Sequence, residues 1–229
     1  GSMTTHTFTN IPTGTHAIKL TLSGYQDWIG TATVAVGSTT YVYAALTVGV
    51  GSVTVYNATG TLIGIYTAIQ AGINACPTGG TVSVEAGTYT EAVYINKGIA
   101  LVGAGSNSTT ITGSGISATN TVTFDGTSTN GARVSGFRIT GATKYGIYCN
   151  NCSPTITNNT IYGNSNAGIS CYYYSSPTIT SNTISGNGSG IYCDASSPAI
   201  TNNTISGNGY GINCYNSSFP VIISNTISG

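Results

Sequence analysis

Charged residues are scarce in this sequence. Of 229 residues, five are Lys or Arg and five are Asp or Glu, so 4% of the chain is charged and its net charge is zero. Globular domains ordinarily carry about a quarter charged residues. The chain therefore has no basic surface with which to bind nucleic acid or an anionic membrane, and we expect neither as a partner.

Groups that ligate metals or transfer protons are also few. The histidines are His6 and His16, both far from the cysteines in sequence. Cys149 and Cys152 form one C-x-x-C pair, whereas a zinc site needs a second pair or a nearby histidine. We expect no metal and no cofactor.

The sequence lacks an apolar run long enough to cross a membrane. The longest, Tyr41–Val50, is interrupted by Thr47 and Gly49, and no signal peptide is present. Gly1-Ser2-Met3 resembles a cloning remnant, and the chain stops at Gly229 inside a repeat. We therefore expect a fragment of a longer protein.

Glycine, threonine, serine and asparagine are abundant. There are 32 glycines, yet 40% of residues are apolar and the mean hydropathy is +0.15. Disordered chains combine low hydrophobicity with high charge, so this one should fold. Thr, Val, Ile and Tyr favour strands and Gly and Asn favour turns, which predicts an all-β fold.

The C-terminal half consists of repeats. The segment Ser153–Ile161 recurs at 176–184, 197–205 and 218–227, and Gly-Ile-x-Cys recurs with the same spacing near 22 residues. Val134 and Ile139 lie one period earlier, so the repeat is clearest from residue 134. This period, with short strands, predicts the coils of a parallel β-helix stacked about 4.8 Å apart.

Stacked coils place like residues in ladders. Isoleucines such as Ile147 and Ile169 should point inward, and a structural ladder of asparagines should bond from coil to coil. Cysteines two positions after the inward isoleucines should form a second, apolar column of free thiols. The predicted ladder residues are Asn159, Asn182, Asn203, Asn225, Cys149, Cys171, Cys193 and Cys214.

Earlier coils are expected where apolar residues alternate. The pairs are Val82 and Val84, Ile99 and Leu101, and Val122 and Phe124. Upstream, Ile65, Ile69 and Ile73 recur every four residues, which predicts a helix over about 65–75 that caps the first coil.

Several of these segments resemble a known superfamily. Residues 69–75 (IQAGINA), 80–89 (GTVSVEAGTY) and 99–103 (IALVG) resemble the start of pectin-lyase-like right-handed β-helix proteins. The later ITNNTISGN coils resemble the repeats of that superfamily, including NosD-like proteins. The resemblance implies a right-handed, single-stranded parallel β-helix over residues 51–229.

Residues 4–50 differ in character. Ile11–Ile18, Ser23-Gly24-Tyr25 and the alternating stretches 33–36 and 40–46 resemble the latter half of a PEGA domain, a small β module of microbial surface proteins. The resemblance implies a partial PEGA-like module here, and Ser52–Gly60 is a candidate for another strand.

Pectin-lyase-like proteins include polysaccharide lyases and glycoside hydrolases, which use acidic clusters. Here Asp125 and Asp194 occupy equivalent places about three coils apart, or roughly 14 Å. Glycosidase carboxylates lie about 5–9.5 Å apart. Arg133, Arg138 and Lys144 fall within one coil and can face Asp125, either as surface ion pairs or as a contact for an anionic sugar. We expect no catalysis.

The outer face carries tyrosines and amides between the inward residues. Flat rings beside hydrogen-bonding groups suit sugars, although tyrosine also stacks along sheets for structural reasons. The candidate glycan-binding residues are Tyr148, Tyr172, Tyr173, Tyr192, Asp194 and Tyr215. Outward threonines at 155, 157, 178 and 180 resemble an ice-binding array, but the pattern changes at Ala199 and Val221.

We therefore predict a non-catalytic structural or adhesive module at the cell surface or outside the cell. Its expected partners are polysaccharide or cell-wall glycan on the outer face, and further copies of itself through exposed β-helix ends. A carbohydrate-active lyase or hydrolase is the alternative, and an ice-binding protein is the third.

Overall fold

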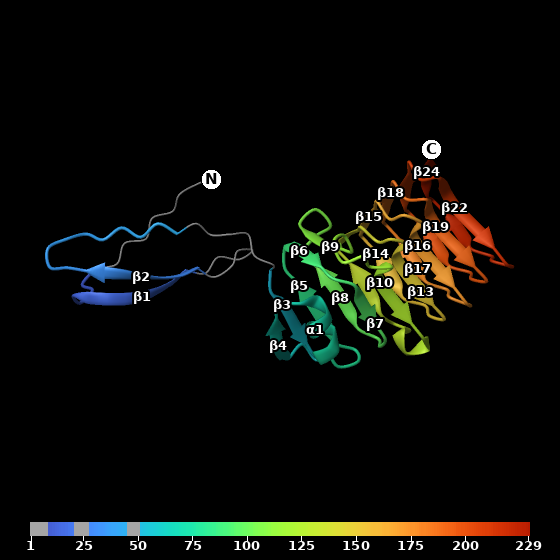
Figure 1. Cartoon of the computed structure of the whole chain (residues 1–229). Helices are drawn as coiled ribbons and strands as arrows, with labels where there is room; N and C mark the ends of the chain where they lie inside the picture. Colours follow the sequence, from blue (N-terminus) through green and yellow to red (C-terminus); the bar gives the residue numbers. More distant parts are fainter. Residues whose placement is uncertain (1–8, 21–27, 45–50) are drawn as a thin grey trace. The chain divides into compact units, whose positions relative to one another are not determined.

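The computed structural model describes residues 9–20, 28–44 and 51–229, and the chain divides into two compact units, one up to Gly49 and one from Val50 (Figure 1). In the first unit, β1 (Gly14–Leu20) and β2 (Trp28–Val34) pair antiparallel. Residues 40–44 form no strand, so the predicted strand over 40–46 is wrong where it is described, and 45–46 lie outside the described residues. Ser23-Gly24-Tyr25 also lies outside them, and the PEGA-like resemblance stays a prediction.

The second unit is a parallel β-helix with three sheets, which confirms the predicted fold (Figure 1). One sheet, named here the tyrosine-bearing sheet, contains β7 (Val93–Ile95), β10 (Asn120–Asp125), β13 (Tyr145–Asn150), β16 (Ala167–Tyr172), β19 (Ser189–Asp194) and β22 (Tyr210–Tyr215). The second contains β5 (Thr81–Val84), β8 (Ala100–Gly103), β11 (Arg133–Ser135), β14 (Thr155–Thr157), β17 (Thr178–Thr180), β20 (Ala199–Thr201) and β23 (Val221–Ile223), with β3 and β4 at its edge. The third contains β6 (Gly87–Thr90), β9 (Thr109–Thr112), β12 (Arg138–Thr140), β15 (Thr160–Tyr162), β18 (Thr183–Ser185), β21 (Thr204–Ser206) and β24 (Thr226–Ser228).

The strands pair like residue with like residue. Ile147 pairs with Ile169, and Ile156 pairs with Ile179, as the period of the sequence predicts. These isoleucines are buried, and together with Phe124 and Phe137 they form one core that runs the length of the solenoid. The alternating pairs predicted for the earlier coils also lie in this core: Val82, Val84, Ile99, Leu101, Val122 and Phe124.

The N-terminal end of the solenoid is covered by a helix and a hairpin. The hairpin consists of β3 (Val53–Tyr56) and β4 (Leu62–Tyr66), and β3 pairs antiparallel with β5. Helix α1 (Ile69–Ala75) buries Ile69 and Ile73 against this end. The helix is therefore shorter than predicted, because Ile65 lies in β4, where it is 64% exposed. Strand β3 falls within the candidate strand 52–60, and it belongs to the β-helix, inside the predicted bounds of 51–229.

Hydrogen-bonded asparagine ladders hold two corners of the C-terminal coils. The predicted ladder is present: Nδ2 of Asn159 donates to Oδ1 of Asn182, Asn182 donates to Asn203, and Asn203 donates to Asn225. A second asparagine ladder, which the sequence analysis missed, occupies the next corner. It joins Asn164, Asn187 and Asn208. The Gly-Asn pairs at 163–164, 186–187 and 207–208 are its signal in the sequence.

Serines hold the third corner, between the tyrosine-bearing sheet and the second sheet. The backbone N–H of Cys152 donates to Oγ of Ser175, that of Ser175 to Ser196, and that of Ser196 to Ser218. A serine reaches less far than an asparagine and makes fewer bonds, so this corner is the least constrained of the three. Its length changes from coil to coil, with four residues between β13 and β14 and five between β16 and β17.

Candidate functional site

Five tyrosine rings form a continuous stack on the outer face of the tyrosine-bearing sheet. We call Tyr145, Tyr148, Tyr172, Tyr192 and Tyr215 the tyrosine stack. Successive ring centroids lie 5.5, 5.9, 5.9 and 5.7 Å apart, and the Tyr173 ring lies 5.6 Å from that of Tyr172. The strand register brings together the predicted tyrosines and adds Tyr145, which the sequence analysis missed.

The stack alternates between two columns of outward residues. Tyr148, Ser170, Tyr192 and Asn213 form one column, and Asn150, Tyr172, Asp194 and Tyr215 form the other. The predicted residues Tyr148, Tyr172, Tyr192, Asp194 and Tyr215 therefore lie in two adjacent columns. Ser170, in the first column, is fully buried and its Oγ has no hydrogen-bond partner. We attribute this to the rings of Tyr148 and Tyr192, which flank the small serine above and below.

Two phenols of the stack, those of Tyr148 and Tyr172, keep their protons. Burial raises the pKa of Tyr148 and of Tyr172 above the ordinary value, and the nearby Tyr192 and Asp194 act in the same direction on Tyr172. At neutral pH these side chains are uncharged hydroxyl groups that donate and accept hydrogen bonds.

Beside the stack, one corner of the solenoid is hollowed by a difference in length. Five residues separate Cys171 from Pro177, and five separate Cys214 from Pro220. Only four separate Cys193 from Pro198. The short corner therefore lies between two longer ones. The resulting notch, lined by Tyr174, Ser176, Ala195, Ser197, Asn216 and Ser217, has a volume of about 330 Å³.

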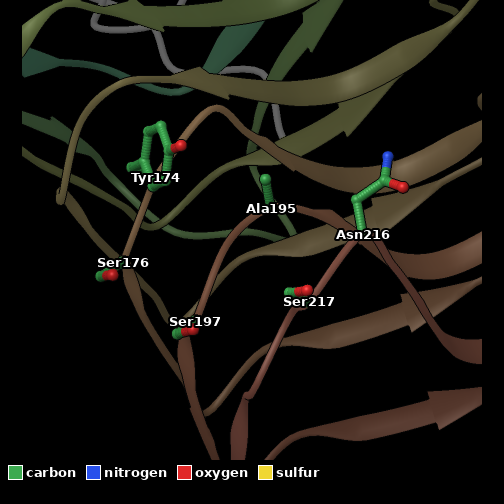
Figure 2. A pocket seen from close by; sticks show the side chains of 6 residues that line it. All are labelled: Tyr174, Ser176, Ala195, Ser197, Asn216 and Ser217. Carbon is green, nitrogen blue, oxygen red and sulfur yellow. The ribbon is translucent and has the colours of Figure 1, made fainter.

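Figure 2 shows Ala195 between the side chains of Tyr174 and Asn216. A second hollow of about 220 Å³ adjoins the notch through these same residues and extends it to Tyr172, Tyr173 and Asp194. The notch thus leads from the tyrosine stack around the corner towards the second sheet.

The long corners hold their residues in an unusual conformation. Tyr173 and Tyr174 have φ angles of 46° and 58°, and they are 61% and 82% exposed. Bulky residues at positive φ cost on the order of 1–3 kcal/mol each and are found where the surrounding structure fixes them. A short corner has one such residue, at 151 or 195, whereas this long corner has Tyr173 and Tyr174 in succession, and both rings are exposed.

Polar groups of the notch are mostly uncharged. Nδ2 of Asn216 donates to Oδ1 of Asp194 at 2.6 Å, and the backbone N–H of Tyr174 donates to the carbonyl of Ala195 at 2.7 Å. Oγ of Ser197 accepts the N–H of Phe219 and keeps its own hydrogen for donation. Asp194 is the one ionisable carboxylate among the lining residues, and none of them is cationic.

The remaining described carboxylates serve as structural acceptors. Glu91 binds the N–H groups of Ile69 and Gln70 at the start of α1, and Glu85 accepts the N–H of Ser52. Asp125 accepts hydrogen bonds from the Tyr94 hydroxyl and from Nδ2 of Asn150.

Asp125 and Asp194 lie in one outward column, separated by Asn150 and Tyr172. Three coil steps of about 4.8 Å place them roughly 14 Å apart, beyond the reach of paired acid and base catalysis.

The basic residues of the same coil do not join Asp125 in any ion pair among the described residues. The Arg138 guanidinium instead lies 5.9 Å from the Tyr162 ring centroid, and its Nε is buried without a hydrogen-bond partner. Arg133 lies on β11 and Lys144 just before β13. The sequence-based contact of these side chains with Asp125 is therefore not formed.

The cysteine column lies inside the solenoid. Cys149, Cys171, Cys193 and Cys214 are in register, all six cysteines of the chain are free thiols, and only Cys214 is exposed. Neighbouring thiols and burial raise the pKa of Cys171 and of Cys193, so these groups stay protonated. Within the described ranges, no three or more His, Cys, Asp or Glu side chains are grouped so as to hold a metal ion.

The threonine face shows where the ice-binding pattern stops. Thr155 pairs with Thr178 on the outside of the second sheet, but Ala199 and then Val221 continue the column.

Of the described helices, none is long and apolar enough to span a membrane.

Comparison with known proteins supports the architecture. Residues 91–228 match the family model described as the right handed beta helix region. No curated protein matches the chain. The matched range takes in the whole tyrosine stack, the notch and all three corner ladders.

Proposed function

Because the chain belongs to the right-handed β-helix family, we propose that it is a rigid, non-catalytic surface module that binds glycan on its tyrosine stack. The observation that carries the proposal is the stack itself: five rings in contact along one face, edged by Asn150, Asn213 and Asp194. Sugars present apolar ring faces edged by hydroxyls, and this arrangement offers a partner to each.

The structural part of the proposal rests on the coil geometry. Every coil from β7 to β22 is hydrogen-bonded to its neighbours on three sheets, which makes the solenoid stiff along its axis. Its outer surface is hydroxyl- and amide-rich and nearly uncharged. Such a module suits the cell surface or the extracellular space, where it separates or attaches other parts.

A carbohydrate-active enzyme is the second candidate, favoured by the presence of Asp194 beside aromatic rings. It needs a second carboxylate or a metal nearby. Among the described residues, the carboxylates other than Asp194 are engaged elsewhere in hydrogen bonds. We therefore infer binding without cleavage.

The test is retention of the purified chain on a panel of insoluble polysaccharides, with and without calcium, while new chain ends are assayed in the supernatant. We expect retention without release of ends. Tyr192→Ala should weaken retention about two- to twelvefold, since a stacked ring contributes roughly 0.5–1.5 kcal/mol. Tyr162→Ala, which removes a tyrosine from the third sheet, is the matched control.

Three results would contradict the proposal. Absence of retention on every polysaccharide would remove glycan binding. If Tyr192→Ala and Tyr162→Ala reduce retention equally, the loss of retention is not specific to the tyrosine stack. Release of chain ends that disappears in Asp194→Asn would establish an enzyme instead.

A further inference from the structure

We infer that the notch at residues 174, 195 and 216 is a binding site for a short stretch of neutral glycan, lying across the solenoid axis. The site rests on the proposed function. The notch fixes where on the face the glycan binds, in which direction its chain runs, and which charge class of sugar is accepted.

The direction follows from which coils line the notch. The floor is the short corner from Asp194 to Ser197, and the walls are the longer corners that carry Tyr174 and Asn216. The hollow therefore follows the chain path of one coil and is closed on both sides along the axis. A glycan within it runs around the corner, perpendicular to the stack of coils.

The dimensions suit a few sugars. The four residues from Asp194 to Ser197 span at most roughly 10 Å, the length they would have if extended, and the walls stand two coil steps, also roughly 10 Å, apart. The two hollows of about 330 and 220 Å³ share Tyr174, Ala195 and Asn216 in their linings, so they lie side by side at this corner. The larger is within the range of small-ligand pockets.

The chemistry of the lining favours a neutral sugar. Tyr172, Tyr173 and Tyr174 supply ring faces at one end, while serine hydroxyls and the Asn216 amide supply donors and acceptors at the other. The sole charge is negative, on Asp194. A uronic acid would meet this carboxylate with no lining cation to compensate, so anionic glycans should be rejected.

Ala195 is the position at which the inference is tested. It has a φ of 47°, and Asn151 occupies the equivalent place in an earlier coil with a φ of 50°. Ala195→Tyr fills the notch with a ring in the same left-handed conformation that Tyr174 already adopts. Asn151→Tyr places the same side chain, in the same conformation, at a corner outside the notch and serves as the matched control.

The measurement is calorimetric titration with di-, tetra- and hexasaccharides of glucan, mannan and xylan, and with hexagalacturonate as the anionic probe. We expect at least one neutral hexasaccharide to bind, hexagalacturonate to bind at least tenfold more weakly, and affinity to stop increasing beyond the tetrasaccharide. Ala195→Tyr should weaken binding at least tenfold, whereas Asn151→Tyr should change it less than twofold.

Each other outcome overturns a defined statement. If neutral glycan binds and Ala195→Tyr has no more effect than Asn151→Tyr, the notch is not the site, while glycan binding by the face stands. Equal binding of hexagalacturonate refutes the charge argument. If no hexasaccharide binds the unmodified chain, the notch fails as a site, and the polysaccharide panel described above decides whether the stack binds longer polymers.

If Ala195→Tyr changes the urea midpoint of unfolding, the variant Tyr174→Asn is used in its place. Asparagine accepts the left-handed conformation and removes one wall, so the same tenfold loss is expected.

Discussion

Asn182 offers the sharpest test of what holds the coils in register. Its Nδ2 donates to the Ile156 carbonyl at 2.9 Å and to Oδ1 of Asn203 at 3.0 Å. Its Oδ1 accepts the backbone N–H of Asn159 at 3.0 Å and Nδ2 of the same residue at 3.2 Å. Replacing it with alanine therefore removes bonds to the coils on both sides.

The magnitude follows from the groups left behind. Asn182→Ala deprives the Asn159 N–H and the Ile156 carbonyl of these partners, and both residues are buried. An unsatisfied buried group costs roughly 1–3 kcal/mol, so the free energy of unfolding should fall by roughly 2–6 kcal/mol. At an m-value of about 2 kcal/mol/M, the urea midpoint should fall by about 1–3 M.

The assay is urea unfolding followed by circular dichroism, with Asn202→Ser as the control. Asn202 is exposed with a φ of 56°, and serine holds the equivalent positions 181 and 224 at a φ of 57°. We expect this control to leave the midpoint unchanged. A loss in Asn182→Ala no larger than that of the control would refute the argument that the ladder stabilises the solenoid.

Asn182→Asp separates hydrogen bonding from packing, because the side chains have nearly the same shape. The carboxylate would still accept from Asn159 but would face the oxygens of Ile156 and Asn203. Such a group has a raised pKa in the folded state, so the folded form binds the proton more tightly than the unfolded form. Stability should therefore be higher at acid pH and fall as pH rises through that pKa.

Two further predictions concern other columns of the solenoid. Gly190→Ala should destabilise the chain by on the order of 1–3 kcal/mol, measured by urea unfolding, because a Cβ there would lie 2.6 Å from both the Gly211 carbonyl and the Ile205 side chain. An unchanged midpoint would show that the coils can move apart. Cys214, whose pKa is raised to about 11 by burial and by Cys193, should be the one thiol alkylated by iodoacetamide in the folded chain. Its rate should rise about tenfold per pH unit from 7 to 10, and a plateau near pH 9 or several adducts by mass spectrometry would contradict this.

The coil architecture was predictable because identical residues recur at a fixed spacing. Ile156, Ile179 and Ile200 are in register in the structure. This register was predictable because the period of the sequence shows which residue of each strand points inward. The asparagine ladder was predictable for the same reason. The Gly-Ile-x-Cys motif was also visible in the sequence. The reason for its glycine was not visible, because the next coil comes close to it only in the folded chain.

Departures from the period were harder to interpret. The spacing of Ile65, Ile69 and Ile73 fits one helix face, yet a strand ends at Tyr66 and the helix begins only at Ile69. The notch was missed although its cause is in the sequence, because the repeat was described by a mean spacing near 22 residues and the unequal corner lengths were not compared. A single extra residue in a corner has no periodicity, so only the folded chain shows which side chains it brings together.

The like-to-like ladders also make each coil an interchangeable unit of length. A coil bonds above and below through the same three sheets and the same corner residues, so removing one whole repeat would bring Asn159 next to Asn203 with the same amide pairing. Duplication or loss of a repeat would thus alter the reach of the solenoid without requiring a new core. The gain or loss of a repeat would change the order of long and short corners. That order decides how many notches the surface carries and how far apart they lie.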